Sequence, residues 1–312
     1  MALEEMGELV LHEIGSKLGS KDAAVLGCVN KRLRVSASDE SLWINFCSQE
    51  LNLSVPEDHL GNPTPSFKVA YQKWREAFNM YPWPLVQRVN KCWGSLKSWT
   101  ATNFPEALTT LRKGVSEAEI KEVEEKLGVK LPLPTKVLYR FCDGQAITGR
   151  DSRSALGLIG GYSFYDHLVN VYLLPLSEVI TRTKDFVRHL GFSSRNKYIV
   201  VAVSSTYREK LFFLNCMNGQ LYVGTRNLSS DGEMIPCVSF PLISSVHDTK
   251  SCEQQDAMLL WLEEHGRRLN NGIIGLRVEG KHRSINLFPE TSPLCSIAIT
   301  NGIKVTTVHF SI

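Results

Sequence analysis

The side chains that most often carry chemistry are scattered along this 312-residue chain and do not gather into motifs. No two cysteines have the C-x-x-C spacing, and no cysteine–histidine cluster has the spacing of a zinc site. The eight cysteines stand singly among apolar neighbours, as reduced cysteines of intracellular proteins usually do: Cys28, Cys47, Cys92, Cys142, Cys216, Cys237, Cys252 and Cys295. We therefore expect neither a metal ion nor a cofactor.

An enzyme would have to use Cys142, Asp143, His167 or His247, and no known catalytic signature surrounds them. Cys142 lies on an apolar helical face, which predicts a packed thiol. The glycine-rich run 157–161 lacks the frame of a phosphate-binding loop and indicates turn or bulge glycines. The chain is thus expected to be non-catalytic, with no catalytic residue.

Composition points to a folded globular protein. Hydrophobic residues make up 43% and charged residues 21% of the chain, with a net charge of +3, so nothing demands nucleic acid or a membrane surface as a partner. The longest apolar runs, such as 198–203, are far shorter than a membrane span. We predict an intracellular protein of the cytoplasm or nucleus, since the basic run 31–34 is too short to indicate nuclear import.

The elements that position any site fall into four segments and define an α+β fold. Residues 1–50 predict three short helices, among them 10–18 and 23–33, and such a small unit often needs a partner for stability. Residues 51–105 form a helical linker whose four tryptophans suggest an inter-domain core: Trp74, Trp83, Trp93 and Trp99.

Residues 106–272 mix helices and strands. Ser116 and Glu119 form a capping box, Asn218-Gly219 indicates a hairpin, and helices are expected over 177–190 and 254–269. Residues 285–312 alternate like strands.

The first 47 residues resemble an F-box, chiefly through Lys31-Arg32 followed by the run from Ala37 to Trp43. Met6-Gly7, Asn30 and Leu33 depart from the family pattern. The resemblance implies that a Skp-type adaptor, and through it a cullin, binds a helix face in this segment. The adaptor-binding residues implied are Val10, Leu11, Ile14, Leu18, Val29, Leu33, Leu42 and Trp43.

Residues 127–144 resemble the opening of a SUKH (Smi/Knr-like) domain, whose known roles are in protein binding. The combination is similar to the plant Skp-interacting-partner F-box proteins, which carry a third, ApaG-type β-sandwich. Residues 293–299 and the strands around Asn301-Gly302 resemble its first strands, but about 100 residues would be needed to complete a sandwich.

These resemblances imply the substrate-recognition subunit of an SCF-type cullin E3 ubiquitin ligase, with a target protein that the sequence does not identify. The alternative is an adaptor-independent binding module in which a degenerate F-box serves only as a helical cap.

Overall fold

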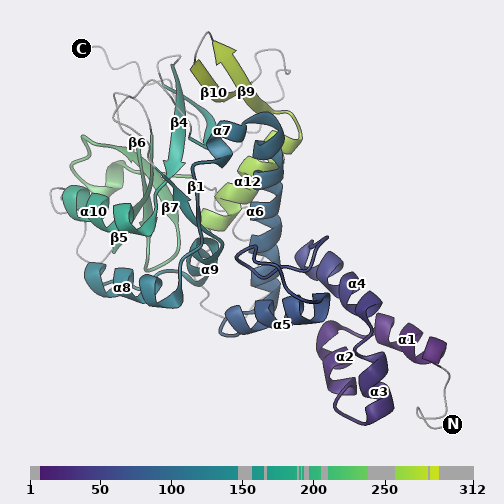
Figure 1. The fold of residues 1–312 in the computed structure, drawn as a ribbon. Coiled ribbons are helices and arrows are strands. Elements are labelled where there is room, and N and C mark those ends of the chain that lie inside the picture. The colour runs from purple at the N-terminus through teal and green to yellow at the C-terminus, as the bar shows by residue number, and fades with distance from the viewer. Residues whose placement is uncertain are drawn as a thin grey trace. The chain divides into compact units, whose positions relative to one another are not determined.

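The computed structural model describes residues 8–146, 157–164, 167–187, 190, 192, 197–204, 210–237, 257–279 and 282–287. The chain divides between Gly94 and Ser95 into two compact units (Figure 1). We call them the helical unit (up to Gly94) and the sheet unit (from Ser95). The division lies inside α6 (Trp83–Asn103), and therefore inside the segment that the sequence predicts as a linker.

The helical unit begins with four short helices where the sequence predicts three: α1 (Glu8–Lys17), α2 (Ser20–Leu26), α3 (Lys31–Ser36) and α4 (Glu40–Leu51). The single helix expected over 23–33 is wrong, because the chain leaves helical geometry at Asn30. Asn30 is extended, and its side-chain oxygen accepts a hydrogen bond from the Leu33 amide at 2.8 Å, which starts a new helix.

The predicted linker supplies part of the core of the helical unit. In α5 (Phe67–Ala77), Ala70, Tyr71 and Trp74 are buried, and α5 packs against α4. The Trp74 ring stacks on Phe78 with a centroid distance of 5.9 Å. Residues after position 50 are therefore needed to complete this small helical core.

The sheet unit opens with α7 (Pro105–Leu108), β1 (Leu111–Lys113), α8 (Glu117–Leu127), α9 (Leu133–Phe141) and β2 (Cys142–Gln145). The predicted capping box is confirmed, since Ser116 and Glu119 bond each other's backbone amides. Gly144 in β2 has φ +67°, and a Cβ there would lie 2.5 Å from the Leu173 carbonyl oxygen, so only glycine fits at this position.

A six-stranded antiparallel sheet follows, in the order β3-β4-β5-β6-β7-β8. Its strands are β3 (Ile159–Phe164), β4 (His167–Leu173), β5 (Tyr198–Ser204), β6 (Lys210–Asn215), β7 (Leu221–Thr225) and β8 (Ile235–Pro236). The β6–β7 hairpin confirms the turn predicted at Asn218-Gly219, where Gly219 has φ +74°. The register of β3 shifts between Ile159 and Tyr162, as the predicted bulge glycines require.

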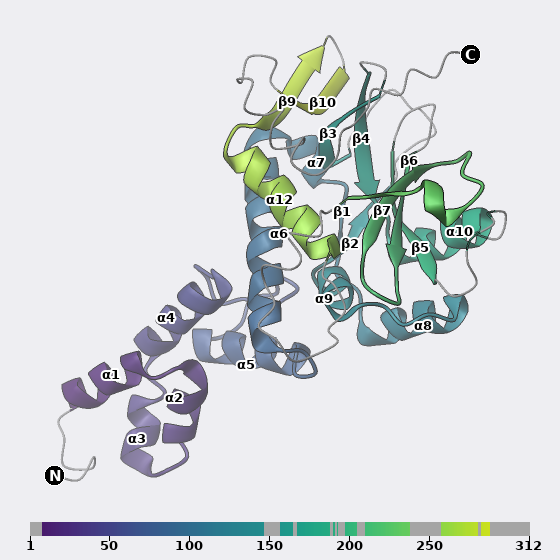
Figure 2. The same cartoon turned by 180° about the vertical axis from the view of Figure 1, so that it is seen from behind.

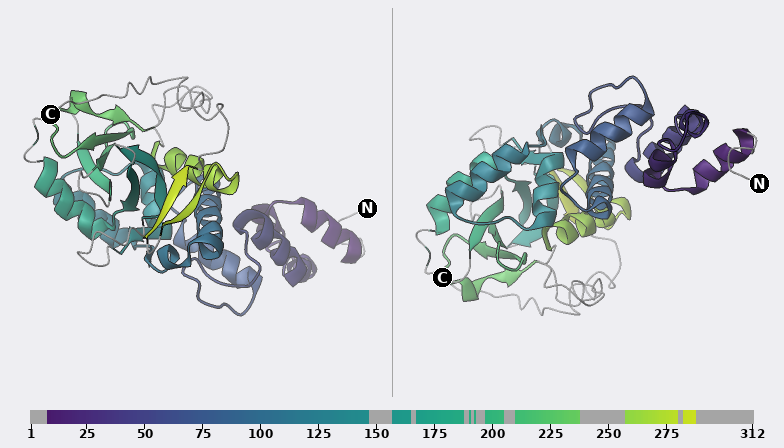
Figure 3. Two further views of the ribbon diagram at one scale, coloured as in Figure 1. Left: turned by 90° about the horizontal axis from the view of Figure 1, so that it is seen from above. Right: turned by 90° about the horizontal axis from the view of Figure 1, so that it is seen from below.

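Helices cover both faces of this sheet (Figure 2). α10 (Leu176–Val187) packs on β5 beside α8, and the two helices run side by side in Figure 3. From the other face, Trp261 of α12 (Ala257–Asn270) contacts Phe212 at a centroid distance of 4.9 Å, and every residue of β5 is buried. The predicted α+β class is confirmed.

The hairpin of β9 (Ile274–Glu279) and β10 (His282–Leu287) adjoins β3 and β4 and includes the first residues of the tail predicted to be ApaG-like. Residues 288–312, which carry most of that prediction, lie outside the described residues. Among the helices that the structure describes, none has the length and apolar character to cross a membrane.

Candidate functional site

Half of the eight predicted adaptor-binding residues form the core of the helical unit. Leu11, Leu33, Leu42 and Trp43 are each at most 3% exposed. The Trp43 indole nitrogen donates a hydrogen bond to the Ala37 carbonyl oxygen at 2.8 Å, and its ring contacts Tyr71 at a centroid distance of 5.4 Å. In this chain these four side chains hold the helices together and present almost no surface.

The other four predicted residues are accessible to different degrees. Val10 is 46% and Val29 64% exposed, while Ile14 and Leu18 are half-buried. The predicted face therefore mixes packing residues with surface residues. Val29, predicted as an adaptor-binding residue, is exposed after the end of α2.

Three further apolar residues are exposed in the same segment and were not predicted: Val25, Val35 and Ile44, at 59%, 71% and 41%. Of the eleven large apolar side chains exposed among the described residues, five lie between positions 10 and 44. Val35 could have been found from its place beside Arg34 and Ser36, in a helix of six residues that buries only Leu33. We call Val10, Val25, Val29, Val35 and Ile44 the exposed aliphatic set.

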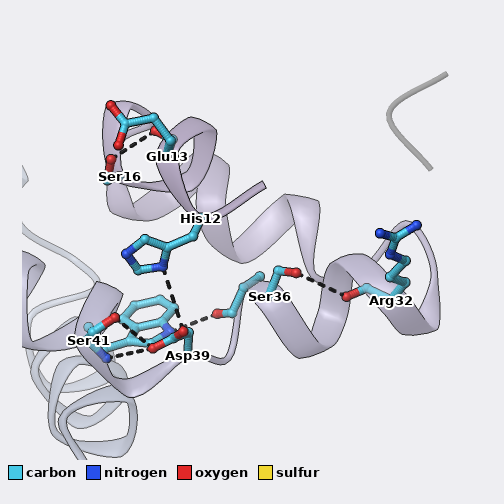
Figure 4. Close-up of polar contacts among 9 residues, drawn as sticks. His12, Glu13, Ser16, Arg32, Ser36, Asp39 and Ser41 are labelled. Carbon is cyan, nitrogen blue, oxygen red and sulfur yellow. Dashed lines mark hydrogen bonds and ion pairs between the residues drawn. The ribbon is translucent and has the colours of Figure 1, made fainter. Parts of the chain in front are cut away.

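Polar contacts fix the start of α4, where the sequence predicts a helix cap. Asp39 accepts hydrogen bonds from the backbone nitrogen and hydroxyl of Ser41 at 2.9 and 2.7 Å, and His12 Nδ1 lies 3.7 Å from its other oxygen (Figure 4). The hydrogen bonds from Ser41 hold the pKa of Asp39 below its ordinary value. Asp39 thus caps the N-terminus of α4, and His12 of α1 lies beside the cap.

A second polar cluster joins α4 to the helices that follow. Glu50 Oε2 accepts hydrogen bonds from the Tyr71 hydroxyl at 2.6 Å and the Trp83 indole nitrogen at 2.7 Å, with Gln87 Nε2 at 3.3 Å. The Tyr71 hydroxyl is also 2.6 Å from Ser20 Oγ in α2. We call these five residues the Glu50 cluster; it connects α2, α4, α5 and α6.

A groove of about 690 Å³ lies between α2 and α5. Residues of both helices line it, together with Arg34 of α3. The residues that line it include Lys21, Ala24, Val25, Cys28, Arg34, Lys68, Gln72, Arg75 and Glu76. We call this feature the α2–α5 groove.

An enzyme would have to use Cys142, Asp143, His167 or His247, and those of them that the structure describes do not form a reactive site. Burial raises the pKa of the Cys142 thiol to about 11, and its side chain is fully buried, so the thiolate is disfavoured and out of reach of a substrate. Asp143 is buried beside Arg112, which donates to it at 2.9 Å, and accepts the Leu176 amide at 2.8 Å. The side chain of His167 and all of His247 lie outside the described part.

A second pocket, of about 500 Å³, lies in the sheet unit beside Glu124, Lys197 and Met217. The Glu124 carboxylate is already neutralised by Lys136 at 2.8 Å and Lys130 at 3.2 Å, and Lys197 donates to the Gly128 carbonyl oxygen. Within the described ranges, no group of His, Cys, Asp and Glu side chains is arranged to hold a metal ion.

Known proteins share both halves of this architecture. The SMI1 / KNR4 family (SUKH-1) matches residues 114–252, which include the six-stranded sheet. F-box protein SKIP16 of Arabidopsis thaliana is 57% identical over 307 residues, covering 98% of this chain and 70% of that protein. Human F-box only protein 3 is 25% identical over 237 residues, covering 69% of this chain and 46% of the relative. The chain belongs to the family of F-box proteins that also carry a SUKH domain.

Proposed function

We propose that this chain is the substrate-recognition subunit of an SCF-type cullin E3 ubiquitin ligase. The F-box at residues 1–50, supported by the helical segment 51–105, docks a Skp-type adaptor, and the domain at 106–272 holds a target protein. The chain performs no chemistry itself and acts in the cytoplasm or nucleus. Its contribution is proximity, because a bound target reaches a high effective concentration near the ubiquitin-conjugating enzyme.

The exposed aliphatic set is the observation that best supports adaptor docking. Five accessible β-branched side chains lie in a segment of 35 positions, and a partner groove would bury those that it covers. Burying one such side chain contributes about 1.5–3 kcal/mol, so a few of them supply a useful binding energy. The buried residues of the earlier prediction act indirectly, by holding these positions in place.

Val29→Asp tests the proposal, because Val29 is 64% exposed and the substitution leaves the core intact. A charge at an apolar interface should weaken binding of purified Skp-type adaptor by about thirtyfold or more, measured by calorimetry, since hot-spot contacts exceed 2 kcal/mol. Val55→Asp is the matched control, as Val55 is 52% exposed in the same unit but outside the set. Wild-type affinity in Val29→Asp would remove Val29 from the interface.

Calorimetric titration of the wild-type chain with adaptor also distinguishes the proposed function from the alternative, an adaptor-independent binding module. If the wild-type chain stays monomeric when mixed with adaptor at micromolar concentration, the adaptor-independent binding module replaces the proposal.

A further inference from the structure

The pocket of about 500 Å³ in the sheet unit lies between the end of α8 and the turn that follows β6. Its apolar lining consists of Val129, Cys216 and Met217. Val129 and Cys216 are 7% and 3% exposed, whereas Met217 is 58% exposed. A pocket of this volume is in the range of ligand sites and can hold one large side chain with parts of its neighbours. We call it the α8–β6 pocket.

Hydrogen bonds fix the backbone that forms this pocket. Gly128 ends α8 in the left-handed conformation, and its carbonyl oxygen accepts a hydrogen bond from Lys197 Nζ at 2.7 Å. The Cys216 amide donates to the Lys197 carbonyl oxygen at 2.8 Å, and the Met217 amide donates to Asn215 Oδ1 at 2.9 Å. A partner would therefore meet a preformed surface, which lowers the entropic cost of binding, while the flexible Met217 side chain adjusts to it.

Positive charge exceeds negative charge around the α8–β6 pocket. Two carboxylates, those of Glu124 and Glu125, line it, and the lysines that line it or pair with these carboxylates are Lys121, Lys130, Lys136 and Lys197. The buried Glu124 is shared by Lys136 at 2.8 Å and Lys130 at 3.2 Å. Lys197 forms no ion pair with any carboxylate that the structure describes. Four lysines against two carboxylates leave an excess of two positive charges.

This combination suits an acidic protein segment that carries one large apolar side chain. The apolar side chain would contact Val129 and Met217, as anchor residues do at the centre of protein interfaces. Carboxylates beside it would lie near Lys130 and Lys197, where complementary charge favours encounter and orientation. Nucleic acid fits less well, because its binding depends on neutralising many phosphates and the excess here is only two charges.

We infer that the α8–β6 pocket binds the target protein, through an acidic segment that places one large apolar side chain against Val129 and Met217. The inference rests on the proposed function, in which the domain at 106–272 holds the target. It adds the position of the binding site and the chemistry of the segment that the site receives, and it involves no residue of the helical unit.

A synthetic peptide with capped ends, in which one leucine stands between two glutamates, is the probe. Added to the full chain, it should shift the backbone amide resonances of Gly128, Val129 and Met217 in a saturable way, with a Kd of about 1 mM or tighter. Two matched peptides separate the contributions, one with alanine for leucine and one with glutamine for both glutamates. Each should bind at least threefold more weakly.

Met217→Asp tests the apolar contact, because Met217 is largely exposed and its replacement leaves the buried residues in place. The variant should bind the leucine peptide at least fivefold more weakly. Ile235→Asp is the matched control, since Ile235 is 52% exposed in the same unit and does not line the pocket. The control should stay within about twofold of wild type.

Lys130→Gln/Lys197→Gln tests the charge requirement, because glutamine keeps a hydrogen-bond donor at both positions and removes the charge. Binding should weaken at least threefold, and it should respond less to added salt than wild-type binding does. Lys113→Gln/Lys126→Gln removes two charges at exposed positions outside the pocket lining and should leave binding unchanged. Circular dichroism of all four variants checks that the fold is retained.

The inference is overturned if the leucine peptide gives no saturable shifts, if the shifts lie away from the pocket, or if Met217→Asp binds it like wild type. Titration with purified adaptor keeps this result apart from the proposed function, because both pocket variants should bind adaptor with wild-type affinity. A chain that binds adaptor and not the peptide retains the proposed function without the inference. If the wild-type chain does not bind adaptor, the proposed function fails first.

Discussion

His265 in α12 illustrates how a single side chain can couple the sheet unit to pH. It is 5% exposed, and its Nε2 lies 2.9 Å from the Leu158 carbonyl oxygen, which can only accept a hydrogen bond. Nε2 therefore carries the proton of a neutral ring. Burial lowers the pKa of His265 to about 4, against an ordinary value of about 6.5.

Between pH 6.5 and 4 the unfolded chain binds a proton at His265 that the folded chain does not, so the free energy of unfolding of the sheet unit should fall as the pH falls through this window. Above pH 6.5 the contribution is complete. His265→Leu should lower stability at every pH but flatten this slope, as measured by urea unfolding between pH 5 and 7. Equal slopes in the two proteins would contradict a buried neutral His265.

At the scale of elements, the short helix α3 depends on its cap. A helix of six residues has little stability of its own, and the Asn30 side chain satisfies one of its free amides. The residue that departs from the F-box pattern at position 30 is therefore the one whose side chain caps α3.

Asn30→Ala should cost about 1 kcal/mol in the helical unit and reduce hydrogen-exchange protection of the amides in α3. Asn30→Asp retains an acceptor and should remain close to wild type. Unchanged protection in the alanine variant would mean that packing of Leu33 alone sets the helix.

Helix caps and turns could be predicted from the sequence, but the burial of individual side chains could not. The capping box at Ser116 and the turn at Asn218-Gly219 depend on neighbours within a few residues, so the sequence indicates them directly. The same periodicity that marks a helical face does not say whether that face packs on its own chain, as Leu33 does, or stays open, as Val29 does. The Glu50 cluster joins residues up to 67 positions apart, from Ser20 to Gln87, and leaves no local signal.

At the scale of the whole molecule, the division between Gly94 and Ser95 predicts that the two units unfold independently. Trp43 is a central core residue of the helical unit, with ring contacts to Phe46 and Tyr71. The helical unit is small, so the loss of one large side chain removes much of its stability.

Trp43→Ala should cost about 3–5 kcal/mol in the helical unit, enough to unfold it and to abolish the proposed adaptor binding. Hydrogen exchange should show lost protection in α1–α5 and native protection in α8, α9 and β5. Loss of protection in the sheet elements as well would show that the two units unfold together.

The Glu50 cluster has a practical consequence for transplanting this F-box into another protein. A graft that ends at residue 50 would keep the Glu50 carboxylate but remove Tyr71, Trp83 and Gln87, the three donors that it accepts from. It would also uncover the Trp43 ring, which rests on Tyr71. The smallest portable cassette is therefore the whole helical unit, residues 8–94, and a fusion protein designed on the sequence motif alone would carry an F-box with one side of its core missing.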